Sequence, residues 1–255
     1  MTIPMEHIRA ALGRICALET YAAIHRLALE LMPSPSAMPQ DSTSPISSVV
    51  GVQTIDDTGR VTSSSKSAEE AADSLTTSAY LSTLDAVGPI IEYLFDETIS
   101  RKGITAEVLA GFCISSRAFG VGRREVLRRG FAAWLQRDYA AAILFLLPQI
   151  ERAVQNIVQG AGRSGVQLPK GNAAMDYKLL DGLLTDSATK KVLGDDGAKY
   201  LRVLLTDKRG WNIRNYVLHG WVDPCSLGRP VCDRVVHAAL LLAAKTVDTD
   251  ETPTP

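Results

Sequence analysis

Long apolar runs, clustered cysteines and an excess of charge of either sign are all missing from this 255-residue chain. The longest uninterrupted apolar run, residues 140–147, has only eight residues, whereas a membrane-spanning helix needs about 20. The four cysteines, at positions 16, 113, 225 and 232, are too few and too scattered for a disulfide framework. We therefore expect no membrane span, and we expect the thiols to be reduced.

The sequence also lacks a secretory signal and an excess of basic residues, and both absences bear on location and function. The first residues, MTIPMEH, carry an acidic side chain where a secretory signal carries basic ones, and no long apolar segment follows. This favours a cytoplasmic protein. The 27 basic and 28 acidic residues give a net charge of -1, whereas a dedicated DNA-binding domain is usually strongly basic. Any nucleic-acid site must therefore be local.

The spacing of apolar residues predicts an all-α protein. Residues 1–32 form an N-terminal amphipathic helix that ends at Pro33, and residues 33–67 form a Ser/Thr/Pro-rich linker too polar to bury a core. In the linker, segments 49–55 and 60–62 flank a turn at 56–59 and predict a small β-hairpin. Residues 68–246 form the helical domain and 247–255 a disordered tail. The domain's predicted helices are 68–100, 105–117, 123–146, 148–159, 176–184, 187–205, 212–219 and 230–246.

Several familiar motifs are incomplete. Gly120 and Gly122 begin a dinucleotide fingerprint, but Glu125 stands where its third glycine belongs. Residues 165–170 lack the glycine that precedes the lysine of a P-loop. His219, Cys225, Cys232 and His237 match no common zinc spacing, and a buried thiol pair between packed helices is the simpler interpretation. We therefore expect neither a metal nor a cofactor.

Residues 210–220, which read GWNIRNYVLHG, form a segment whose side chains indicate a binding and catalytic site. Asn212 is suited to cap a helix over 213–219, and Gly220 falls where a left-handed residue is wanted. Asn215 and His219 are four residues apart and share one helix face, and Arg214 is long enough to reach the same point. Arg214 opposes the helix dipole unless an anion binds there, whereas His219 at the other end is suited to acid–base work. The segment predicts a phosphate site with a proton carrier.

The pattern Arg214-Asn215-x-x-x-His219 resembles the signature of the HEPN superfamily (higher eukaryotes and prokaryotes nucleotide-binding domains). With Gly220 included, it is similar to an uncharacterised family defined by RNxxxHG. Segment 146–151, LLPQIE, and the leucine-rich segment 201–207 are also similar to family members. The resemblance covers residues 125–245.

This resemblance implies a helical bundle that forms a homodimer with its two motifs facing each other. It also implies a metal-independent endoribonuclease that leaves 2′,3′-cyclic phosphate and 5′-OH ends and acts in stress response or antiviral defence against phage. Whether a regulatory partner protein holds the nuclease silent is left open by the sequence. His219 would be the general base or acid, Arg214 would stabilise the phosphorane, and Asn215 would position it. Glu151 is a further candidate, as a polar partner from the preceding helix. HEPN toxins controlled by nucleotidylation carry tyrosine two residues after the histidine, where this chain has Trp221.

Less specific interpretations stay open. Some HEPN domains are non-catalytic modules that bind RNA, nucleotides or proteins. Arg214 could be a surface arginine paired with an acid, His219 a helix-capping residue, and Glu151 a partner of Arg152 or Gln155. Two basic clusters could follow an RNA backbone, or could be solvated faces balanced by acids distant in sequence; their candidate residues are Arg124 and Arg128 in the first, and Arg202, Lys208 and Arg209 in the second.

Overall fold

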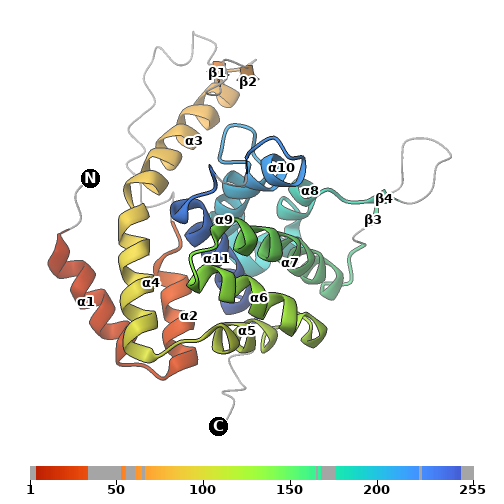
Figure 1. Cartoon of the computed structure of the whole chain (residues 1–255). Helices are drawn as coiled ribbons and strands as arrows, with labels where there is room; N and C mark the ends of the chain where they lie inside the picture. Colours follow the sequence, from red (N-terminus) through yellow and green to blue (C-terminus); the bar gives the residue numbers. More distant parts are fainter. Residues whose placement is uncertain are drawn as a thin grey trace.

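The computed structural model describes residues 4–33, 53–55, 61–64, 67–164, 166–167, 176–223 and 226–247. This part of the chain is mostly helical, as predicted, with two short antiparallel hairpins (Figure 1). The helices are α1 (Met5–Cys16), α2 (Thr20–Glu30), α3 (Ala68–Ala86), α4 (Gly88–Lys102), α5 (Ala106–Ile114), the short η3 (Val121–Arg123), α6 (Arg124–Leu135), α7 (Tyr139–Gly160), α8 (Leu180–Leu184), α9 (Ser187–Leu205), α10 (Ile213–Leu218) and α11 (Arg229–Ala244).

Helix α11 is the centre of the fold. Every residue from 232 to 244 is buried, because α11 packs against α2, α4, α5, α7 and α9. A helix that is apolar on nearly all sides has to be enclosed by other helices, and Figure 1 shows α11 inside the bundle. The charged side chains that α11 carries inward are therefore paired with other groups. Asp233 accepts hydrogen bonds from Trp134 Nε1 at 2.6 Å and from Arg229 Nε at 3.2 Å.

The predicted N-terminal helix is two helices, so that prediction was wrong in its continuity. The chain turns at residues 17–19 between α1 and α2, where Lys102 at the end of α4 donates to the carbonyl oxygens of Cys16 and Leu18. This contact satisfies carbonyl groups that a continuous helix would have satisfied. The two helices belong to the main bundle, because Leu12 of α1 and Leu27 of α2 lie in the same core as α11.

Other helix boundaries also differ from the prediction. The predicted helix 68–100 is divided at Val87, just before the Gly88-Pro89 start of α4. The predicted helix 123–146 is divided because Arg137 adopts a left-handed conformation, with φ 65°, and Asp138 then caps α7. The predicted break before Pro148 is absent. Pro148 lies inside α7 on the exposed side, and Leu144, whose carbonyl the proline ring leaves without a donor, is also an exposed residue.

The linker hairpin is confirmed for the residues that the structure describes. Strand β1 (Gln53–Ile55) pairs antiparallel with β2 (Val61–Ser64). A second hairpin, β3 (Val166–Gln167) with β4 (Asp176–Tyr177), occupies part of the segment predicted as helix 176–184, so only α8 of that helix is present. The turn at 56–60, most of the remaining predicted linker and residues 248–255 of the predicted tail lie outside the described residues.

No helix in the described ranges combines the length and the apolar character that crossing a bilayer requires.

Candidate functional site

The segment that carries the motif is held against the end of α9 by a close backbone contact. The Trp211 amide donates to the carbonyl oxygen of Val203 at 3.0 Å. Gly210 makes this approach possible, since a Cβ atom at position 210 would lie only 2.2 Å from that same oxygen. The chain therefore leaves α9, returns to its last turn and starts α10 at a fixed point.

Helix α10 begins differently from the prediction. Asn212 occupies the N-cap position, but its φ is 47° and its side chain makes no capping hydrogen bond. Its Oδ1 instead accepts from Asn215 Nδ2 at 2.6 Å. At the other end the prediction is confirmed, because Gly220 is left-handed with φ 68°. The helix is short, and contacts of its side chains with other elements fix its orientation.

The main such contact joins α10 to α7. Arg214 Nε donates to Glu151 Oε2 at 3.1 Å, and Arg214 Nη2 lies 3.4 Å from Glu151 Oε1. Arg214 Nη1 also donates to Asn215 Oδ1 at 3.1 Å. Both Arg214 and Glu151 are about one-fifth exposed, so solvent screens this bidentate pair only in part. Arg152, the alternative partner of Glu151, donates to Gln155 at 3.2 Å instead.

The three motif residues line one cavity of about 470 Å³. It lies between α8, the end of α9, the following loop and α10. The second basic cluster lines it too. The complete lining is Leu179, Leu180, Asp181, Arg202, Thr206, Asp207, Lys208, Arg209, Arg214, Asn215 and His219. The fold therefore brings together six of the nine residues singled out in the sequence, and Glu151 stands directly behind Arg214.

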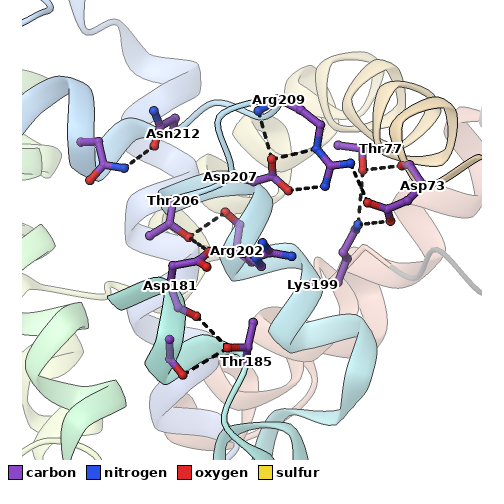
Figure 2. A network of polar contacts seen from close by, with 12 residues as sticks. Asp73, Thr77, Asp181, Thr185, Lys199, Arg202, Thr206, Asp207, Arg209 and Asn212 are labelled. Carbon is purple, nitrogen blue, oxygen red and sulfur yellow. Dashed lines mark hydrogen bonds and ion pairs between the residues drawn. The ribbon is translucent and has the colours of Figure 1, made fainter. Parts of the chain in front are cut away.

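Most of the cations around this cavity are already paired with carboxylates. Arg202 Nε donates to Asp181 at 2.8 Å. Figure 2 shows Arg209 between Asp207 and Asp73, which accept at 2.8 Å and 2.6 Å. Burial alone would raise the pKa of Asp207, but hydrogen bonds from Arg209 hold this pKa below its ordinary value. Arg202 and Arg209 therefore present less net charge to a ligand than the sequence suggests.

The cavity also has two groups that are not paired in this way. Lys208 is exposed and makes no ion pair within the described part of the chain. The His219 imidazole is exposed and forms no side-chain hydrogen bond to any described residue, but its ring lies 5.4 Å from the ring of Trp221. A cation and an imidazole that both face solvent at one cavity are accessible to a bound anion.

The first basic cluster is elsewhere. Arg124 and Arg128 are on α6, and neither lines the cavity. Arg124 Nε donates to Glu107 at 2.6 Å and Arg128 Nε to Glu125 at 2.8 Å. Hydrogen bonds from Arg128 and then Arg129 lower the pKa of Glu125 to about 2. The cluster is a charged surface with its own counterions.

The residues considered for zinc do not form a centre. Cys232 and His237 are buried in α11, whereas His219 is exposed at the cavity and Cys225 lies outside the described residues. Among the described residues, no three His, Cys, Asp or Glu side chains are grouped so that they could hold a metal ion.

Sequence reasoning missed several residues of the site. Asp181 and Thr206 line the cavity, and Asp73 reaches Arg209 from α3, 136 positions away in the chain. Nothing in the sequence links these positions. Leu179, which is 70% exposed, also lines the cavity, and Trp221, which is 60% exposed, lies beside His219; neither was predicted there. The one signal in the sequence was the position of Trp221, two residues after the motif histidine.

No protein-family model, no curated protein and no solved structure matches this chain. Any assignment of function therefore depends on the cavity and on the motif that lines it.

Proposed function

We propose that this protein is a metal-independent, HEPN-type endoribonuclease. The observation that carries the proposal is that Arg214, Asn215 and His219 line a single cavity together with Lys208. The set contains cations for a phosphate, an amide to orient it and an imidazole to move a proton. This is the chemistry that cleavage of an RNA phosphodiester requires.

The proposed reaction is an in-line attack within the RNA. The ribose 2′-oxygen attacks the adjacent phosphorus, the bond from phosphorus to the 5′-oxygen breaks, and the products are a 2′,3′-cyclic phosphate and a 5′-OH end. One proton leaves the 2′-OH and one is delivered to the 5′-oxygen. His219 performs one of these transfers. In the proposed homodimer, whose motif helices face each other, the partner's copy of this histidine would perform the other.

The Arg214 guanidinium can serve a phosphate without leaving Glu151. Its five N–H groups include three that already donate, two to Glu151 and one to Asn215. One N–H remains on each terminal nitrogen. Glu151 therefore acts as a positioning residue that orients Arg214, while the two remaining N–H groups and Lys208 stabilise charge on the phosphorane.

The test compares wild type, His219→Ala and the control His7→Ala, an exposed histidine on α1 far from the motif in sequence. Each is incubated in EDTA with single-stranded RNA and with DNA of the same sequence. We expect wild type and His7→Ala to cut only the RNA, with cyclic phosphate ends, and His219→Ala to lose at least about 100-fold in rate. Unchanged RNA cleavage by His219→Ala would refute the assignment.

A second candidate function is a non-catalytic module that binds RNA, a nucleotide or a protein in the same cavity. It is favoured by the ion pairs that occupy Arg202, Arg209 and Arg214, and by the absence of any hydrogen bond from a described residue to orient the His219 ring. It predicts binding without products. The role in stress response or phage defence belongs to the proposal as a consequence of the resemblance, and the cytoplasmic location belongs to it as an expectation from the N-terminal sequence.

A further inference from the structure

Trp221 is held next to the cavity by the turn that ends α10. The Gly220 amide donates to Val217 O at 3.1 Å and the Trp221 amide to Tyr216 O at 2.9 Å. This pair of hydrogen bonds, with a left-handed glycine between them, is a Schellman motif. The Trp221 ring packs over α10, 6.2 Å from the Tyr216 ring and 5.4 Å from the His219 ring. The backbone therefore fixes an indole beside the proposed proton carrier.

This indole is unusually exposed for its size. Trp221 is 60% exposed, whereas Trp134, a tryptophan on the core face of α6, is only 5% exposed. Its ring is tilted by 34° from the His219 imidazole, which itself lines the cavity. The exposed part of a large flat apolar ring gains free energy when another flat ring covers it. A ligand in the cavity could supply that ring.

The positive charge at the cavity indicates which class of ligand would bind beside Trp221. The cavity beside Trp221 presents Lys208 and the two remaining N–H groups of Arg214. A ligand that joins an anionic group to a flat aromatic ring would satisfy both features, and a nucleotide in a single strand has this composition. Neighbouring base pairs cover the faces of a base in a duplex, so only an unpaired base can stack on the indole.

We propose that Trp221 is the platform on which an unpaired base stacks when RNA occupies the cavity, and hence a specificity-determining residue. This proposal rests on the proposed function, because it takes the ligand to be RNA. It assigns the indole a role in distinguishing an unpaired base next to the bound phosphate from a paired one. His219 and Arg214 act on the backbone, and Trp221 contacts the base.

The experiment measures binding of an uncleavable 2′-O-methyl oligonucleotide, so no catalysis is needed for a result. Three probes share one sequence: a single strand, the same strand in a duplex, and a strand with abasic sites at its central positions. Wild type is compared with Trp221→Leu, which keeps an apolar side chain but removes the ring, with Trp221→Phe, and with the control Arg124→Ala on α6.

We expect Trp221→Leu to weaken binding of the single strand about 10-fold, and Trp221→Phe and Arg124→Ala to change it less than threefold. On the abasic strand, Trp221→Leu should bind as wild type does. Equal affinity of Trp221→Leu and wild type for the single strand, an equal loss on the abasic strand, or no binding of any strand would overturn the proposal. So would loss of a dimer in light scattering of Trp221→Leu, because the ring would then cover a second copy of the chain.

The two proposals can fail separately. If His219→Ala abolishes cleavage while Trp221→Leu binds normally, the nuclease stands and the stacking role falls. If no RNA is cut but Trp221→Leu loses affinity only for strands that carry bases, the stacking role stands and the chemistry falls.

Discussion

At the scale of single residues, carboxylates that form ion pairs with the cations of the cavity reduce the positive charge that it presents to an anion. Counting charges along the chain gives Arg202, Lys208, Arg209 and Arg214 with only Asp207 beside them. In the structure, Arg214 is also neutralised by Glu151 and Arg209 by Asp73. A phosphate that binds here competes with carboxylates as well as with water. The balance between these anions sets the affinity for RNA.

Removing the charge of Glu151 should therefore strengthen binding. We expect Glu151→Gln to bind an uncleavable single strand about threefold more tightly, as expected for loss of a partly exposed ion pair. The slope of log affinity against log salt should become steeper by about 0.7, because one more cation meets the single strand. Affinity would be measured by fluorescence anisotropy between 50 and 200 mM salt, about the range over which such slopes are resolved.

The matched control for this change is Glu125→Gln on α6. Glu125 also binds arginines, Arg128 and Arg129, but away from the cavity. If both variants gained the same affinity, the effect would come from net charge alone, and the ion pair of Arg214 would have no special role.

At the scale of elements, local patterns predicted the helices better than their ends. The 3.6-residue periodicity located the outer bounds of α9 and located α11 to within about two residues, but it did not predict the kink of α9 at Gly194, where φ is 75°. The same periodicity predicted one continuous helix through residues 17–19, where the structure has a turn. The contact that accompanies this turn comes from Lys102, which is 84 positions from Leu18 in the chain. The break before α7 did have a local signal, Asp138 at the N-cap. The helix break predicted at Pro148 was wrong, because the proline lies on the exposed face of α7, where the helix tolerates it.

The loop between α9 and α10 shows how an element positions the site, and it gives the next prediction. Gly210→Ala would place a Cβ atom 2.2 Å from Val203 O, so the loop must move and the Trp211 hydrogen bond must lengthen. We expect this variant to lose about 2 kcal/mol or more of the free energy of unfolding. Measured by urea denaturation, it should also lose cleavage under conditions in which the variant remains folded.

Gly182→Ala is the control for the loop variant. Gly182 lies on the exposed side of α8, and a Cβ atom there would meet nothing within 4 Å. Alanine should stabilise this helix by about 0.5–1 kcal/mol. A Gly210→Ala protein as stable as wild type would mean that the close approach to α9 does not hold the loop in place.

At the scale of the whole molecule, one buried histidine connects three helices. Tyr200 of α9 lies 2.8 Å from His237 Nδ1, and Ala28 O of α2 lies 2.9 Å from His237 Nε2. A carbonyl oxygen only accepts, so Nε2 carries the proton and Nδ1 accepts from the tyrosine hydroxyl. The neutral ring satisfies both contacts. Sequence reasoning considered His237 only as a metal ligand, because its partners are 37 and 209 positions away.

This geometry predicts how stability depends on pH. Burial lowers the pKa of His237 to about 3, with the positive charge of Arg234 adding to the shift, whereas in the unfolded chain the imidazole titrates near about 6.5. Between these values the unfolded state binds one more proton, so acid favours unfolding. The contribution is fully present above about pH 6.5 and is lost as the pH falls, by up to about 1.4 kcal/mol per pH unit.

Urea unfolding between about pH 5 and 8, followed by circular dichroism, would isolate this contribution by comparing variants. His237→Gln should be less stable than wild type at pH 8, and its free energy of unfolding should fall less steeply below pH 6.5, because no buried imidazole is left to protonate on unfolding. His219→Gln, which changes an exposed imidazole at the cavity, should keep the wild-type slope. Parallel curves for wild type and His237→Gln would mean that the core admits the proton in the folded state. Nδ1 would then donate, so the Tyr200 hydroxyl would have to turn and accept from it, whereas the bond from Nε2 to Ala28 O would remain.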